Sequence, residues 1–250
     1  MSILLVSGLA KAFGGVQALR DVGFTVDAGE MLAMIGPNGA GKSTCFNLVN
    51  GQLVPDAGRI ELEGRNILGL APRAVWRLGV GRTFQVAATF ASMTVRENVQ
   101  MALLSHARRL SSPFASATRL QREAADVLLA QVDMQAQADR TAAVLAYGDL
   151  KRLELAMALA NRPRLLLMDE PTAGMAAAER MALMRLTATL AKASGIAVLF
   201  TEHDMDAVFT YADRIIVLAE GILILQGTPA QVRADPRVRE AYLGEAAEDA

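Results

Sequence analysis

The sequence predicts an α/β fold, with helices covering a mainly parallel β-sheet. A glycine-rich loop, residues 36–44, follows the apolar run Met31–Ile35 and precedes a segment with a helical pattern. Beyond residue 162, strand and helix patterns alternate, as they do when parallel strands are joined by covering helices. Two adjacent carboxylates, Asp169 and Glu170, end one of these predicted strands.

The first third of the chain reads as strands separated by turns. Turn residues at positions 27–29 close the first two strands, and Gly51 ends the helix that follows the glycine-rich loop. Glycine-containing turns flank the alternating strand at residues 59–63, and Pro72 suits the first turn of a short helix. We therefore expect strands at residues 3–9, 22–26, 31–35, 59–63 and 81–84, and a helix at residues 71–78.

From about residue 94 the chain changes to long helical patterns, at 94–109 and 118–131, around a serine-rich loop at 110–117. The alternation then follows, and the turn at Glu220 and Gly221 predicts a closing hairpin. There we expect strands at residues 164–168, 196–200, 214–219 and 222–226, and helices at 177–193 and 205–211. The sequence thus predicts one domain, whose core is formed by residues 1–93 and 162–243, with an inserted helical block at 94–161 and a flexible tail at 244–250.

The composition excludes several classes of function. Lysine and arginine number 25 against 26 acidic residues, so no net charge favours binding to nucleic acid. The apolar runs are far shorter than the ~18 residues of a membrane span. One cysteine, together with a start that lacks a basic region and a cleavage site, favours the cytosol.

The glycine-rich loop has the pattern of a phosphate-binding loop. Gly36, Gly39 and Gly41 let the backbone approach phosphates closely, Lys42 reaches the β- and γ-phosphates, and the Ser43 hydroxyl can ligate Mg²⁺. We expect the whole loop to contact a nucleoside triphosphate: Gly36, Pro37, Asn38, Gly39, Ala40, Gly41, Lys42, Ser43 and Thr44.

The two carboxylates after the strand at 164–168 are candidates for binding Mg²⁺ and activating water beside the phosphates held by this loop. Because side chains alternate along a strand, Asp169 and Glu170 should point in different directions. Asp169 can then hold Mg²⁺ through water while Glu170 faces the attacking water as a general base. Two such residues can also simply cap a helix.

Cys45 lies in the first turn of the helix that follows the loop and allows two interpretations. It can be a small buried apolar residue, which is the common case for a lone cysteine. Alternatively, the helix dipole stabilises a thiolate whose alkylation blocks nucleotide binding.

Three weaker signals narrow the prediction: Gln85 at a strand end, the helix start at residues 145–149, and His203 after a third strand. Each alone is more often an ordinary surface feature. In this order and spacing they resemble the nucleotide-binding subunit of an ABC transporter, over almost the whole chain. The resemblance implies a P-loop NTPase (RecA-like) core with an N-terminal antiparallel β subdomain and an inserted α-helical subdomain.

The resemblance also implies roles for individual residues. Glu170 would be the catalytic glutamate, Gln85 a sensor of Mg²⁺ and the attacking water, and His203 a switch histidine at the γ-phosphate. Phe13 would stack on adenine. Residues 145–149, which occupy the place of the family's signature motif and include Tyr147 and Gly148, would complete the ATP site of the opposite subunit. ATP and Mg²⁺ would be the cofactors, with Mg²⁺ held by Ser43, Gln85 and Asp169.

Within that family the chain is most similar to the ATP-binding subunits of branched-chain amino acid importers. The segments that carry this similarity are residues 13–15, 82–85, 93–98, 145–148, 202–205 and 241–245. It implies a second cassette, identical or paralogous, two transmembrane permease subunits and an extracytoplasmic substrate-binding protein. It also implies a peripheral position on the cytoplasmic face of the membrane. The substrate stays open, because the ATP-binding subunits of importers for urea or other small amides and acids have similar sequences.

The sequence departs from the family pattern at two positions. Ala146 stands where the signature usually has serine, as it does in similar importers. Ala176 stands where the segment that links the two active sites normally has Asp or Asn. We expect this second change to weaken communication between the sites, with slow or uncoupled hydrolysis at one of them.

Three other functions compete with transport. A soluble ABC ATPase that acts on nucleic acid or ribosomes usually has two cassettes or a long insertion. A small-molecule kinase needs lid arginines around an acceptor site, which residues 94–161 do not supply. A regulator that binds ATP without turnover is favoured slightly by the alanine-rich segment at 176–178.

Overall fold

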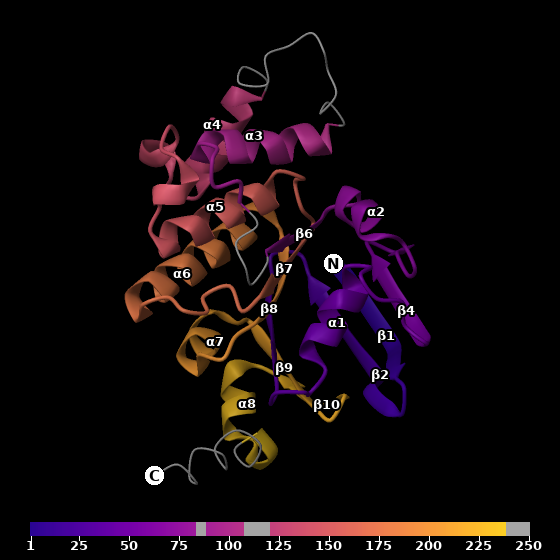
Figure 1. The fold of residues 1–250 in the computed structure, drawn as a ribbon. Coiled ribbons are helices and arrows are strands. Elements are labelled where there is room, and N and C mark those ends of the chain that lie inside the picture. Colours follow the sequence, from indigo (N-terminus) through magenta and orange to yellow (C-terminus); the bar gives the residue numbers. More distant parts are fainter. Residues whose placement is uncertain (84–88, 108–120, 239–250) are drawn as a thin grey trace.

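The computed structural model describes residues 1–83, 89–107 and 121–238, and it contains two β-sheets (Figure 1). The smaller sheet is antiparallel, and its strand order is β2-β1-β4-β5. Its strands are β1 (Ser2–Phe13), β2 (Val16–Asp27), β4 (Ala57–Leu62) and β5 (Arg65–Asn66). The expected N-terminal antiparallel sheet is therefore confirmed.

The larger sheet has six strands in the order β10-β9-β3-β8-β7-β6. All neighbouring strands are parallel except the hairpin of β9 and β10. The strands are β3 (Met31–Ile35), β6 (Val80–Thr83), β7 (Leu165–Asp169), β8 (Ala197–Thr201), β9 (Arg214–Ala219) and β10 (Ile222–Gly227). Because β3, β8 and β7 are adjacent and parallel, the loops that follow them emerge at one edge of the sheet.

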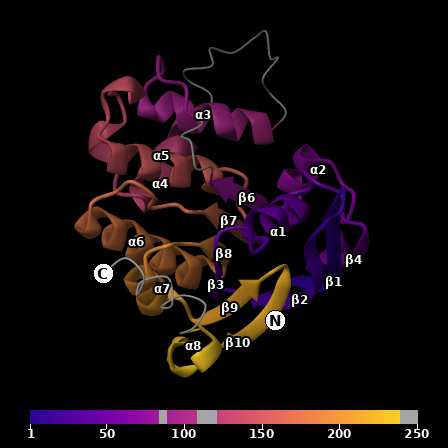
Figure 2. The same cartoon turned by 60° about the horizontal axis from the view of Figure 1, so that its bottom comes forward.

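The helices lie on both faces of the larger sheet, and on one face they cover it together with the antiparallel sheet. They are α1 (Lys42–Val49), α2 (Pro72–Arg77), α3 (Val95–His106), α4 (Arg122–Gln131), α5 (Tyr147–Leu159), α6 (Ala177–Ser194), α7 (Met205–Tyr211) and α8 (Pro229–Ala234). Helices α3, α4 and α5 lie together at one end of the molecule, away from the antiparallel sheet (Figures 1 and 2). Within the described residues, no helix is both long and apolar enough for a membrane span.

The side-chain alternation of the central strands divides the apolar core in two. Met31, Ala33 and Ile35 of β3 belong to a cluster with α3, α5 and α6, whereas Leu32 and Met34 belong to a cluster with α1 and the antiparallel sheet. The central strand is thus buried on both faces, as expected for a parallel sheet covered on both sides. This packing fixes the carboxyl end of β3, where the glycine-rich loop begins.

The element predictions hold with shifted ends. Strands β1 and β2 are longer than expected, while β3 and α7 have the predicted bounds. The short strand β5, helix α8 and two 3₁₀ turns, Gln135–Gln137 and Ala142–Val144, were not expected. The serine-rich loop and the tail at 244–250 lie outside the described residues, and the proposed division into core and helical block stays a prediction.

Candidate functional site

At both ends of the loop after β3, the backbone has a conformation that only glycine adopts easily. Gly36 has a φ of 155°, and a Cβ there would lie 2.1 Å from the carbonyl oxygen of Leu218. Gly41, the N-cap of α1, has a φ of 102°, and its Cβ would lie 2.6 Å from the carbonyl oxygen of Ala18. The loop therefore passes close to β9 and β2 and turns directly into the N-terminus of α1, where backbone N–H groups have no helical partner.

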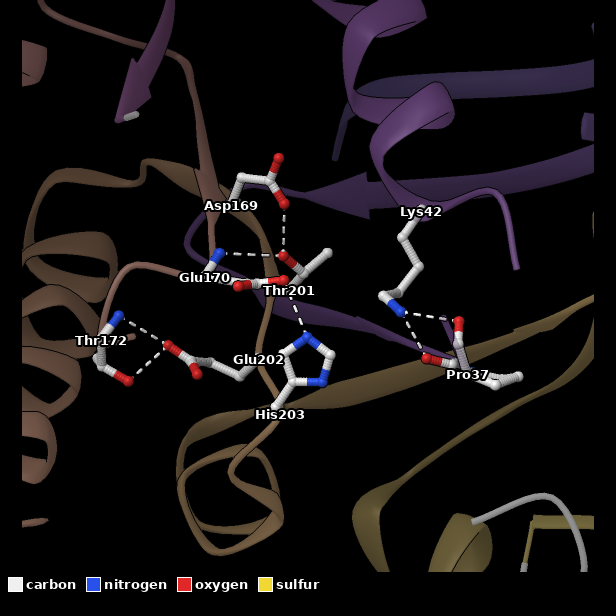
Figure 3. Close-up of polar contacts among 9 residues, drawn as sticks. Pro37, Lys42, Asp169, Glu170, Thr172, Thr201, Glu202 and His203 are labelled. Carbon is white, nitrogen blue, oxygen red and sulfur yellow. Dashed lines mark hydrogen bonds and ion pairs between the residues drawn. The ribbon is translucent and has the colours of Figure 1, made fainter. Parts of the chain in front are cut away.

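Lys42 is the first residue of α1, and its side chain folds back over the loop (Figure 3). Its Nζ donates hydrogen bonds to the carbonyl oxygens of Gly36, at 2.5 Å, and Pro37, at 3.1 Å. Burial lowers the pKa of Lys42, and the charges of Glu170 and Asp169 oppose that shift. The structure therefore brings the loop lysine and both carboxylates into one electrostatic environment.

The other loop residues differ in exposure. Asn38, Gly39 and Ser43 are exposed, Pro37 and Thr44 are half-buried, and Ala40 is buried. The exposed Ser43 hydroxyl lies in the first turn of α1, one residue beyond Lys42.

Thr201, the last residue of β8, holds both carboxylates at the end of β7, Asp169 within the strand and Glu170 just after it. Its hydroxyl donates to Asp169 Oδ1 at 2.8 Å and accepts from the backbone N–H of Glu170 at 3.1 Å (Figure 3). The Glu170 N–H also lies 3.2 Å from the Thr201 carbonyl oxygen. The pairing of β7 with β8 thus fixes the carboxylates relative to the residues after β8.

Glu170 points away from Asp169 for a different reason than strand alternation. Strand β7 ends at Asp169, and Glu170 has a φ of 48°, in the left-handed region that non-glycine residues rarely adopt. Our argument from a period of two was therefore wrong at this residue. The turn aims the carboxylate at His203, whose Nε2 lies 2.9 Å from Glu170 Oε1.

The loop that carries His203 is fixed on both sides. Glu202 Oε1 accepts hydrogen bonds from the backbone N–H of Thr172, at 2.9 Å, and from its hydroxyl, at 2.6 Å. Burial raises the pKa of Glu202, and these hydrogen bonds partly oppose the rise. Asp204 begins α7 by accepting a hydrogen bond from the Ala207 N–H at 2.8 Å. A cavity of about 340 Å³ lies against these loops.

Arg82, near the end of β6, was not predicted as a site residue. Its guanidinium donates to Asn47 Oδ1 at 2.9 Å and Gln52 Oε1 at 2.7 Å, and lies 3.6 Å from Asp169 Oδ2. It therefore connects α1 and the residue Gln52 beyond it to Asp169, the last residue of β7. The predicted site residue Gln85 follows three residues later but lies outside the described residues.

The remaining predicted site residues lie at two other places. Phe13 ends β1, where Lys11 Nζ lies 5.5 Å from its ring centroid, and its side chain is 46% exposed. Tyr147 and Gly148 begin α5, close to residues that follow β7. A Cβ on Gly174 would meet the Tyr147 ring at 3.7 Å, and one on Gly148 would meet the Glu179 carboxylate at 3.2 Å.

Cys45 is fully buried in the cluster between the two sheets. Burial raises the pKa of its thiol to about 12. The burial favours the interpretation of Cys45 as a small buried apolar residue, because desolvation opposes formation of a thiolate.

The residues present fit a nucleoside triphosphate with a magnesium ion. The glycine backbone at Gly36 and Gly41 leaves the loop without side chains where it turns, and Lys42 supplies a positive charge beside it. Ser43 and Asp169 offer the hydroxyl and carboxylate oxygens that suit Mg²⁺, which usually keeps water and phosphate ligands as well.

Comparison with known proteins identifies the family. The model of the family described as "ABC transporter" matches residues 19–173. The chain belongs to the ABC transporter family. It is an ABC-type ATPase that binds ATP, and a second family model, "Branched-chain amino acid ATP-binding cassette transporter", matches residues 223–248.

Similar relatives cover nearly the full length of this ABC cassette. It is 41% identical to the high-affinity branched-chain amino acid transport ATP-binding protein BraF of Pseudomonas aeruginosa, over 98% of each chain. It is 39% identical to the corresponding LivG protein of Escherichia coli, again over 98% of each chain. A solved ADP conformation of an ATP-binding cassette from an ABC transporter has a TM-score of 0.87 at 33% identity and covers 98% of this chain and 99% of that one.

These comparisons support the predicted resemblance, the cassette fold and ATPase activity. Neither predicted alternative, a soluble ATPase outside transport or a regulator that only binds ATP, finds support among them.

Proposed function

We propose that the chain is the ATP-hydrolysing subunit of an importer for branched-chain amino acids, or for a similar small amino acid or amide. The observation that carries this proposal is the full-length similarity to two transport ATP-binding proteins with that substrate in their names. The match of residues 223–248 to the corresponding family model supports it further. The substrate itself would pass through separate membrane permeases.

In this proposal two cassettes, identical or paralogous, hold two ATP molecules between them. The loop at residues 36–44 of one cassette binds the phosphates, Phe13 stacks on adenine, and the α5 start at Tyr147 and Gly148 of the other cassette closes the site. The N-terminus of α5 supports that last role, because its N–H groups favour an anion.

Each polar residue at the strand ends has a part in hydrolysis. Glu170 orients and deprotonates the attacking water, and His203, 2.9 Å from it, senses the γ-phosphate. Ser43, Gln85 and Asp169 would hold Mg²⁺, which neutralises charge on the phosphate oxygens when it is bound. Loss of the γ-phosphate then lets the two cassettes separate and reset the transporter.

We place the contact with the two permeases on the helical block, which would move when the cassettes close. A groove of about 440 Å³ lies where α3 and α5 meet α2, and its lining combines apolar residues such as Trp76 and Met157 with Arg73 and Glu154. A short amphipathic permease segment fits that lining. The chain would then lie on the cytoplasmic face of the membrane, opposite an extracytoplasmic substrate-binding protein.

The decisive experiment measures phosphate release by the assembled transporter with the parent chain and with Glu170→Gln. We expect steady-state release to fall by about a thousandfold in the variant while ATP still binds, because the base is lost and the binding loop is intact. Equal rates would contradict the enzymatic role. Uptake of labelled leucine, isoleucine, valine and urea by the same complex in vesicles then identifies the substrate.

A further inference from the structure

Residues 174–178, which lead from the loop after β7 into the start of α6, have no polar side chain, yet they are connected to the His203 loop. The connection comes from Arg180, in the first turn of α6. Its Nη2 donates a hydrogen bond to the carbonyl oxygen of Met175 at 3.2 Å, and its Nη1 forms an ion pair with Asp204. Arg180 therefore links the backbone of the 174–178 segment to the start of α7.

Asp204 connects Arg180 to the backbone next to His203. One of its carboxylate oxygens is paired with Arg180, while the other caps α7 through the N–H of Ala207. His203 is the residue immediately before it. On the other side of His203, Glu202 is held by the N–H and hydroxyl of Thr172 (Figure 3).

The His203 ring itself has little packing to hold it. Its side chain is 54% exposed, and the described contact of its ring is with Glu170. The Arg180 and Asp204 side chains are only 23% and 28% exposed, so their ion pair is better shielded from solvent than most surface pairs. Arg180, Asp204, Glu170 and His203 all line the same cavity of about 340 Å³.

We propose that Arg180 is a positioning residue that holds His203 against Glu170 and couples the 174–178 segment to it. This inference rests on the proposed hydrolysis at Glu170 and His203. Ala176 has no polar side chain, and the connection to the 174–178 segment runs through the backbone carbonyl of Met175. When the 174–178 segment shifts as two cassettes close, Arg180 carries that shift to Asp204 and so to His203.

The test compares ATP hydrolysis by the assembled transporter with Arg180→Met, Asp204→Asn and both together. Methionine keeps helix propensity but removes the guanidinium. Asparagine keeps the N-cap of α7 but loses the charge. Arg185→Met is the matched control, because Arg185 is an exposed arginine on the same helix.

We expect kcat to fall about tenfold to a hundredfold in Arg180→Met, as a small misplacement of a catalytic group does, with KM for ATP within about twofold. Asp204→Asn should lower kcat similarly, and the double variant should be no slower than Arg180→Met. In a His203→Ala background, Arg180→Met should change kcat little, because it acts through that histidine.

Three results would overturn the inference. The first is a kcat for Arg180→Met equal to that for Arg185→Met. The second is a double variant whose loss of kcat is the product of the two single losses, and the third is an undiminished loss of kcat when Arg180→Met is added to His203→Ala. If Arg180→Met does not fold, Asp204→Asn decides alone, and an unchanged kcat there rejects the inference. Failure of the proposed function looks different, because the parent complex would then release phosphate no faster than Glu170→Gln.

Discussion

Thr201 shows how a residue with no expected contact to ATP can determine the geometry of the site. A single hydroxyl fixes Asp169 by donating to it and fixes the turn at Glu170 by accepting from its N–H. That turn has a left-handed backbone, which is unfavourable for glutamate by roughly 1–3 kcal/mol and is maintained by the surrounding contacts. At the residue scale, the direction of the Glu170 carboxylate therefore depends on its neighbours.

The burial of Cys45 predicts that its thiol is unreactive in the folded protein. With a pKa of about 12, only on the order of one thiol in 100,000 is ionised at pH 7. Maleimide labelling, followed by mass spectrometry, should be negligible both with and without ATP and rapid in denaturant. Fast labelling of the native chain that ATP prevents would favour the thiolate hypothesis instead.

Glu202 should make the stability of the chain depend on pH. Burial raises its pKa in the folded state above the ordinary value of 4.5, so between 4.5 and the folded pKa the folded state binds more protons than the unfolded state. The free energy of unfolding contributed by Glu202 should therefore fall as the pH rises through that window. Glu202→Gln keeps the acceptor for Thr172 and should remove this fall.

Denaturant unfolding at a series of pH values measures the effect. The quantity compared is the free energy of unfolding of the parent minus that of Glu202→Gln. The difference should decline from pH 4.5 upward and then level off. A difference that is flat, or that grows with pH in favour of the parent, contradicts the assignment.

The start of helix α3 is specified by local interactions. Thr94 accepts a hydrogen bond from the Glu97 N–H at 3.2 Å, and Glu97 accepts one from the Thr94 N–H at 2.8 Å. The fully buried Asn98 then holds the preceding chain through Phe90. Such a capping box stabilises a helix by satisfying N–H groups that have no partner within the helix.

Thr94→Ala should lower the free energy of unfolding by about 1 kcal/mol, because the cap is lost. Thr94→Ser keeps the hydroxyl and should be much closer to the parent. Chemical denaturation of the three chains checks this prediction, and equal stabilities for alanine and serine would show that the cap contributes nothing.

Ala176, the N-cap of α6, has no side-chain hydrogen bond to that helix. Ala176→Asn should therefore raise stability by about 1 kcal/mol through capping, whatever its effect on function. If the absence of a polar side chain weakens communication between the two ATP sites, the same variant should also raise the turnover of the assembled transporter. Unchanged turnover in a stabilised variant would reject that explanation.

The sequence predicts elements well where the signal is local. Strand β3 and helix α7 have the expected bounds because an apolar run and a helical pattern define them. Helix α8 was missed although Thr228, Pro229 and Gln231 form a recognisable helix start. The pairs Arg82–Asp169 and Arg180–Asp204 could not be predicted, because tertiary packing brings these partners together from different elements.

For the whole molecule, the order of the parallel strands matters most. Since β3, β8 and β7 are neighbours, the glycine-rich loop, the His203 loop and the two carboxylates meet at one edge of the sheet, although they are far apart in the sequence. The helices α3 to α5 lie at the end of the molecule away from the antiparallel sheet (Figure 1). We propose that ATP bound at that edge acts on these helices, which we expect to contact the permeases.

The central claim, that the loop after β3 binds the triphosphate and powers transport, is tested most directly with Lys42→Ala. Equilibrium ATP binding and substrate uptake by the assembled transporter are measured for the parent and the variant. We predict that ATP affinity falls about tenfold to a hundredfold, as expected for the loss of a charged hydrogen-bond donor, and that uptake is abolished. Unchanged affinity together with unchanged uptake would contradict the account.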